Sequence, residues 1–211
     1  MKRSASGLVA FSILALASRA HADVRTVDAF TAIDLQGLMA AEVHIGSAIS
    51  VDVQGEADLA KLVSTTVKGG TLLIKTPKDF QKRLQGRNDN KLKVVITMPA
   101  LARVTISGTG AIEVDGLSQK TVEASIPGTG SLKLAGKADT LRLTVPGTGE
   151  VRAKDLIASA VELTIPGTAE AVVHATKSFE ANVMGTAMVK VHGKPASVKK
   201  NIVGTAMIDV K

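Results

Sequence analysis

Hydrophobic and polar residues alternate strictly in the second half of the chain, on both sides of a recurring glycine–threonine pair. The first glycines of six Gly-Thr-Gly or Gly-Thr-Ala turns follow one another at steps of 20, 19, 20, 18 and 19 residues. These glycines are Gly108, Gly128, Gly147, Gly167, Gly185 and Gly204. A period in this range is typical of stacked repeats, in which each unit buries its apolar face only against its neighbours.

Four positions counted from each turn glycine are apolar in nearly every copy. Two residues before it stand Ile106, Ile126, Val145, Ile165, Val183 and Ile202. Four before it stand Val104, Ala124, Leu143, Leu163, Ala181 and, breaking the pattern, Lys200. Four after it stand Ile112, Leu132, Val151, Ala171, Val189 and Ile208, and six after it Val114, Leu134, Ala153, Val173, Val191 and Val210. The intervening positions are mostly polar, which predicts strands with one buried face on both sides of a tight turn.

Two architectures are built from strand–turn–strand units. In an antiparallel meander each turn would be a three-residue hairpin loop, whose last residue commonly needs a left-handed backbone and favours glycine. That residue is alanine in three copies, Ala169, Ala187 and Ala206. In a β-solenoid the chain instead turns a corner at each Gly-Thr pair, and Pro127, Pro146 and Pro166 suit a Pro-Gly type II corner with positive φ at the glycine. We therefore predict a β-solenoid.

The first half predicts the same architecture with weaker repeats. Alternating strands are predicted around Val43 and Ile45, Val51 and Val53, Leu72 and Ile74, and over Leu92–Met98. A short helix or turn is predicted over Glu56–Val63, and a polar, irregular surface loop over Thr76–Asn90. The predicted fold class is all-β: one domain over residues 23–211, less regular over 28–100 and with regular repeats of about 19 residues over 101–211.

These motifs together resemble the head GIN domain family of putative auto-transporter adhesins. The resemblance rests on the Phe30–Ile33 opening, Gly-Glu-x-x-Leu at 55–59, Gly-Thr-Leu-Leu-Ile at 70–74, Val-Ile-Thr-Met-Pro-Ala-Leu at 95–101 and the Gly-Thr-Gly turns. It covers about residues 28–211. It implies a right-handed β-helix-like solenoid that serves in cell adhesion without a catalytic apparatus. Threonine replaces the usual serine of the family's turns, and the last three turns end in alanine.

The N-terminus predicts export. A basic start at Met1–Arg3, an apolar run over Gly7–Ala17 and Ala-His-Ala at 20–22 form a secretory signal peptide, with cleavage predicted after Ala22. Three cations leave with residues 1–22, so the net charge falls from +7 to +4. No other apolar stretch is long enough to span a membrane. The predicted location is periplasmic or extracellular.

Composition excludes several kinds of binding site. The chain has no Cys, Trp or Tyr and only four Phe, so it offers few aromatic faces on which nucleobases could stack. We expect no nucleic acid partner. The Gly-Thr turns lead into strands and lack the lysine of phosphate loops, so they are interpreted as structural corners. The column of turn threonines, Thr109, Thr129, Thr148, Thr168, Thr186 and Thr205, is interpreted as a consequence of β propensity rather than as a water-ordering face.

Candidate chemistry is sparse. His174 and His192 both lie seven residues after a turn glycine and are expected to be neighbours, but two imidazoles make an incomplete metal site. Acidic residues are scattered with no repeating column, whereas a polysaccharide-active β-helix enzyme, the alternative function, needs clustered carboxylates. The sequence therefore predicts no catalytic residue, no cofactor-binding residue and no metal ligand. The function predicted is that of a non-catalytic binding or structural module of the cell envelope.

One segment is strongly basic. Residues 75–93 hold seven Lys or Arg against two Asp. The possible contacts for polyanions are Lys78, Lys82, Arg83, Arg87 and Lys91. A solvated loop is the simpler interpretation of such a charge run. The functional interpretation is long-range attraction of envelope or surface glycans and other anionic polymers, which weakens steeply with salt.

Overall fold

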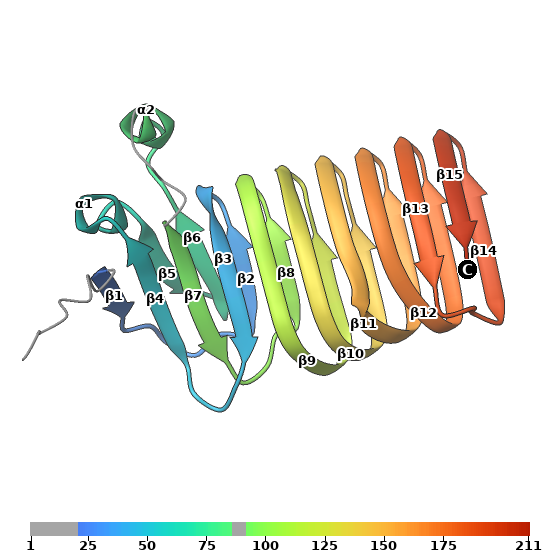
Figure 1. Ribbon diagram of the computed structural model, residues 1–211, viewed down its shortest axis with the longest axis horizontal. Helices are drawn as coiled ribbons and strands as arrows, with labels where there is room; N and C mark the ends of the chain where they lie inside the picture. The colour runs from blue at the N-terminus through green and yellow to red at the C-terminus, as the bar shows by residue number, and fades with distance from the viewer. Residues whose placement is uncertain (1–20, 86–91) are drawn as a thin grey trace, which may run out of the picture.

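The computed structural model describes residues 21–85 and 92–211 and has the predicted architecture. About 69% of the chain is strand and 5% is helix, and one domain forms a β-solenoid of about five turns. The coils stack side by side along the long axis, with the N-terminal half at one end and the C-terminal coil at the other (Figure 1). Among the described residues, no helix is long and apolar enough to cross a bilayer.

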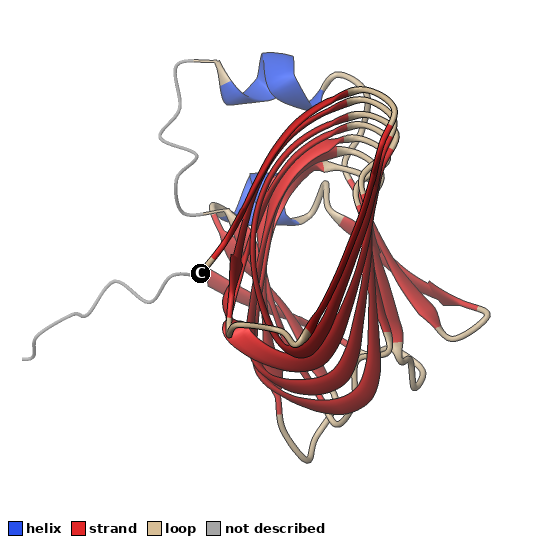
Figure 2. Ribbon diagram, turned by 90° about the vertical axis from the view of Figure 1, so that its right-hand side faces the viewer, coloured by secondary structure: helices blue, strands red, loops and turns tan. Residues whose placement is uncertain are grey.

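Long strands that run through a bend build the regular half. Its strands are β8 (Arg103–Ile106), β9 (Thr109–Ser125), β10 (Thr129–Thr144), β11 (Thr148–Ile165), β12 (Thr168–Val183), β13 (Thr186–His192), β14 (Ser197–Ile202) and β15 (Thr205–Val210). Each of β9–β12 leaves one Gly-Thr corner, passes a smooth bend and returns to the next corner. Viewed end-on, the coil is therefore a flattened loop with two walls, corners at one edge and bends at the other (Figure 2).

Neighbouring coils pair in parallel, which distinguishes the solenoid from a meander. The corner residue Thr129 pairs with Thr148, and Leu143 on the opposite wall pairs with Leu163. The register shifts only within the bends, between Lys133 and Gly136 in one pair of strands. The bends therefore take up the variation in repeat length, and the corners stay aligned.

The core lies between the two walls and consists of the predicted apolar columns. In the column two residues before the glycine, Ile106, Ile126, Val145, Ile165 and Val183 are each 0% exposed. The last member, Ile202, is 42% exposed, because β14 has no described strand on its outer side. Within the described residues no polar or charged side chain is buried.

The first half extends the same stack and covers its N-terminal end. Its elements are β1 (His21–Arg25), β2 (Ala32–Leu35), β3 (Leu38–Ile45), β4 (Ser50–Gly55), α1 (Ala57–Ala60), β5 (Ser64–Lys68), β6 (Thr71–Lys75), α2 (Phe80–Leu84) and β7 (Lys93–Met98). Strands β2 and β3 form the coil that pairs in parallel with β8 and β9. Beyond β7 and β6 the pairing becomes antiparallel, through β4, β1 and β5.

The segment predicted to be irregular contains a short helix. Residues 76–90 were expected to form a polar loop, but α2 lies at Phe80–Leu84. Phe80 is only 1% exposed and belongs to the hydrophobic core. Leu84, at the end of α2, is partly buried against the same core. These two apolar residues hold the segment against the body, which the surrounding charges concealed in the sequence.

The corner glycines do not have the predicted backbone. A type II corner requires positive φ at the glycine, but none of the six turn glycines is among the positive-φ residues. A Cβ on Gly147 would instead collide with the carbonyl oxygen of Gly128 and lie 2.8 Å from the carbonyl carbon of Pro127. Glycine is needed because the corners of successive coils touch. The prediction of a type II corner with positive φ at the glycine is therefore wrong.

Candidate functional site

Helix α2, in the basic segment, projects from the corner edge of the solenoid, near its N-terminal half (Figures 1 and 2). Of the five predicted contacts, Lys78, Lys82 and Arg83 lie on or beside α2, whereas Arg87 and Lys91 fall outside the described residues. Arg83 forms an ion pair with Asp79 at 2.9 Å, and both side chains are about half exposed. Within residues 21–85 and 92–211, Lys78 and Lys82 have no ion pair.

A hollow of about 510 Å³ separates this segment from the first corner. It is lined by Gln36, Gly37, Leu38, Thr76, Pro77, Lys78, Phe80, Gln81, Gly108 and Thr109. The backbone amide of Leu38 donates to the Thr76 hydroxyl oxygen at 3.0 Å, which ties the segment to β3. The hollow is therefore lined by the cation Lys78, by the side-chain amides of Gln36 and Gln81, and by Thr109, the first threonine of the turn column.

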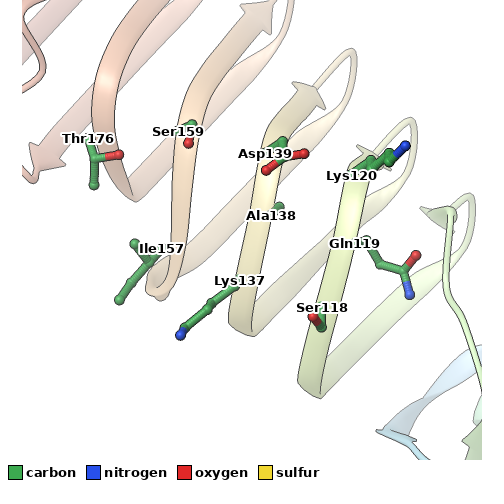
Figure 3. Close-up of a pocket in the computed structure, with 9 residues that line it drawn as sticks. All are labelled: Ser118, Gln119, Lys120, Lys137, Ala138, Asp139, Ile157, Ser159 and Thr176. Atoms are coloured by element: carbon green, nitrogen blue, oxygen red, sulfur yellow. The ribbon is translucent and has the colours of Figure 1, made fainter.

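A second hollow, of about 440 Å³, lies at the bends, on the opposite edge of the solenoid (Figure 3). We call it the bend groove. It is lined by Ser118, Gln119, Lys120, Lys137, Ala138, Asp139, Ile157, Ser159 and Thr176. Lys120 and Lys137 have no ion pair within the described part of the chain. This groove could not be predicted from the sequence, because its residues lie in the bends, away from the columns counted from the glycines.

Many of the outward charges are paired between adjacent coils. Arg103 contacts Glu123 at 2.8 Å, Lys133 contacts Glu113 at 3.1 Å, and Arg142 contacts Glu162 at 2.9 Å. The hydrogen bond that Arg142 donates to the Glu162 carboxylate raises the pKa of Arg142 above its usual value. Each of these pairs is largely exposed to water, and exposed ion pairs add little to stability. These ion pairs make the outer faces of the walls polar but contribute little to the stability of the fold.

The acidic residues are less scattered than the sequence indicated. Glu150 lies in register with Glu170 on the next coil, and Glu162 with Glu180. Glu150 and Glu170 border a hollow of about 380 Å³ that Lys133, Arg152 and Asp155 also line. Two neighbouring pairs of acids therefore share a column, although the sequence predicts no column of acids that repeats along the stack. Arg152 contacts Glu150 at 2.6 Å, so part of this charge is neutralised.

The two histidines are neighbours, as their spacing predicted. His174 pairs in register with His192 on the next coil. In the described residues, no group of three or more His, Cys, Asp or Glu side chains is arranged to hold a metal ion. At the far end of the same wall, His44 contacts Asp115 at 2.7 Å. The histidines thus bring two imidazoles together without a third ligand.

Comparisons with known proteins agree with this architecture. The family model described as putative auto-transporter adhesin, head GIN domain, matches residues 29–195. The crystal structure of a putative adhesin from Bacteroides fragilis has a TM-score of 0.70 at 24% identity, over 90% of this chain and 96% of that chain. Since this identity is low, the likeness shows a common fold.

Two further crystal structures are similar over the same share of this chain and 96% of their own. A putative lipid binding protein from Parabacteroides distasonis has a TM-score of 0.47 at 19% identity. A putative adhesin from the same organism has a TM-score of 0.43 at 18% identity. No curated protein matches the chain.

Proposed function

Because this chain belongs to the family of putative auto-transporter adhesins with a head GIN domain, we propose that it is an exported, non-catalytic binding module of the cell envelope. Its role is adhesion-like, its location periplasmic or extracellular, and its ligands are anionic surface polymers such as acidic glycans. A rigid stack of coils suits this role, because it holds outward side chains at a fixed spacing along an extended surface.

The basic segment beside α2 is the observation that carries the choice of ligand. Over residues 75–85 of this segment, Lys75, Lys78, Lys82 and Arg83 stand against one carboxylate, Asp79, which leaves a local charge of +3. The segment borders a hollow, so a bound chain would gain contacts as well as long-range attraction. The shortage of aromatic residues favours charge over stacking as the means of binding.

Binding of dextran sulfate, with neutral dextran as the control polymer, tests the proposal. We expect saturable binding to the sulfated polymer that weakens steeply between about 0.1 M and 1 M salt, as the Debye length falls from about 10 Å to about 3 Å. The double reversal Lys78→Glu and Lys82→Glu should weaken binding at least tenfold.

A matched control reverses Lys120 and Lys137 in the bend groove, which changes the net charge equally on the opposite edge. Binding by this variant should stay near that of the wild type. Equal weakening in both variants would mean that the polymer senses only the total charge. Unchanged binding in the Lys78 and Lys82 variant would remove the segment from the proposal.

The register of Glu150 and Glu170 favours a second candidate function, a polysaccharide-active enzyme. Paired carboxylates beside Lys133 and Arg152 are groups that general acid–base chemistry on a glycan uses. Incubation with polygalacturonate and alginate, followed by analysis of chain length, separates the two functions. Cleavage that disappears in Glu170→Gln would establish the enzyme and overturn the non-catalytic proposal. Binding without shortened products would support the proposal.

A further inference from the structure

The C-terminal coil leaves two strand edges open. Strand β14 pairs only with β12 and β15 only with β13, so neither has a neighbour on its outer side among the described strands. The other end of the stack departs from the regular coil: it finishes in the antiparallel strands β1 and β5, each of which pairs with one described strand. An uncovered edge with a regular repeat is a template on which another strand can pair.

The last two coils also expose apolar side chains. Six of the nine large hydrophobic residues exposed in the described chain lie in the last two coils: Met184, Met188, Val198, Ile202, Val203 and Met207. Val203 is 76% exposed and Met207 67%. Ile202 belongs to a column that is fully buried in the preceding coils. Open strand edges beside an exposed core residue favour the addition of a further coil. A second copy of this chain could supply it, because that copy carries a coil of the same shape.

One residue of the last coil opposes such stacking. Lys200 lies in register with Ala181, in the inward column that Leu143 and Leu163 occupy in earlier coils. Its Nζ donates a hydrogen bond to the backbone carbonyl oxygen of Ile208 at 3.1 Å. Ile208 is on β15, the opposite wall, so the lysine side chain reaches across the open end of the core. Its ammonium group stands where the next apolar layer would pack.

We propose that Lys200 closes the C-terminal end of the solenoid and prevents a second copy from stacking on it. A stacked copy would enclose the ammonium group in the continuous core, and an unpaired buried charge is strongly unfavourable. In an end-to-end pair of two C-terminal coils, both ammonium groups would be enclosed together. An inward-pointing charge on a terminal strand is a known means of protecting a free edge.

The test compares the self-association of Lys200→Leu and Lys199→Leu in the full chain. Both variants lose one positive charge on adjacent residues of β14, but only Lys200 lies in an inward column. The molar mass in solution, measured by light scattering after size exclusion, should stay monomeric for the wild type and Lys199→Leu. It should at least double for Lys200→Leu. Adding Ile202→Glu to Lys200→Leu should restore the monomer, because it places a new charge in the same open end.

Two outcomes would overturn the proposal. One is a folded, monomeric Lys200→Leu, with folding checked by far-ultraviolet circular dichroism. The other is equal association of Lys199→Leu, which would assign the effect to total charge. If Lys200→Leu does not fold, Lys200→Ala is measured instead, because alanine occupies this position in the coil beneath, at Ala181. The same gain in mass is expected, and a monomer would again contradict the proposal.

Discussion

Each corner glycine lies directly against the backbone of the preceding coil. The amide of Gly147 donates to the carbonyl oxygen of Ile126 at 3.0 Å, and the amide of Thr148 donates to that of Gly128 at 3.0 Å. These bonds hold successive corners at the spacing of paired strands, which leaves no space for a side chain on the glycine. The exposed threonine that follows is free of this restriction.

Replacement of Gly147 by valine should destabilise the protein by about 1–3 kcal/mol, the usual cost of forcing extra atoms into a packed site. Alanine at the same position should cost nearly as much, because its Cβ already collides with the Gly128 carbonyl oxygen. Urea titration of the free energy of unfolding checks both values. Thr148→Val is the matched control and should stay within about 0.5 kcal/mol of the wild type. Wild-type stability in Gly147→Ala would contradict the steric explanation.

The sequence could predict that these positions must be glycine, but not why. Pro146 followed by Gly147 is a familiar type II signal, and the local pattern favoured positive φ. The actual constraint is the contact between two corners 19 residues apart, a distance that no local pattern contains. Phe80 is a similar case, because the core contacts of α2 come from Phe80 and Leu84, two apolar residues within a strongly charged segment.

Within a coil, the column in which a residue lies could be predicted near the corner but not in the bend. Residues counted outward from each glycine fell in the expected columns, since the corners remain in register. The bends absorb steps of 18 to 20 residues, for example between Ala153 and Ile157, where the register with β12 shifts. The bend groove lies where this counting fails. The pairing of Glu150 with Glu170 could have been found, because both lie three residues after a turn glycine.

Coils in the middle of the stack should be more stable than the last coil, because each coil contacts only its neighbours. Leu163→Ala, at a site that is 1% exposed, should cost about 2–5 kcal/mol. Ile208→Ala, in the partly exposed last coil, should cost less than half as much. Native-state hydrogen exchange provides the second measurement: amides of β14 and β15 should exchange well before those of β10 and β11. Uniform protection along the stack would contradict this gradient.

The two ends of the whole molecule are finished by different means. Antiparallel strands cover the N-terminal end, where Arg25 on β1 donates to the carbonyl oxygen of Ala60 at 3.1 Å. At the C-terminal end a single lysine lies across an open core. The first arrangement adds backbone pairing, whereas the second excludes further pairing.

The proposed export adds a prediction that concerns the first strand. Cleavage after Ala22 would leave Asp23–Arg25 of β1 and remove His21 and Ala22, which pair with Gly55 and Gln54 at the end of β4. The retained part keeps the Arg25–Asp23 ion pair at 2.8 Å and the hydrogen bond to Ala60. Mass spectrometry of the exported protein should therefore find Asp23 as the first residue. An exported protein that retained Met1 would contradict the predicted signal peptide.

The stability of shortened chains then tests which N-terminal residues the fold needs and which belong only to the predicted signal peptide. A chain that begins at Asp23 should unfold at the same urea concentration as one that begins at His21, since two terminal residue pairs contribute little. A chain that begins at Thr26 lacks all of β1 and should unfold earlier, because β4 becomes an open edge and the hydrogen bond from Arg25 to Ala60 is lost. Equal stability of all three would show that β1 does not cap the N-terminal end, and the two ends would then differ less than their pairing indicates.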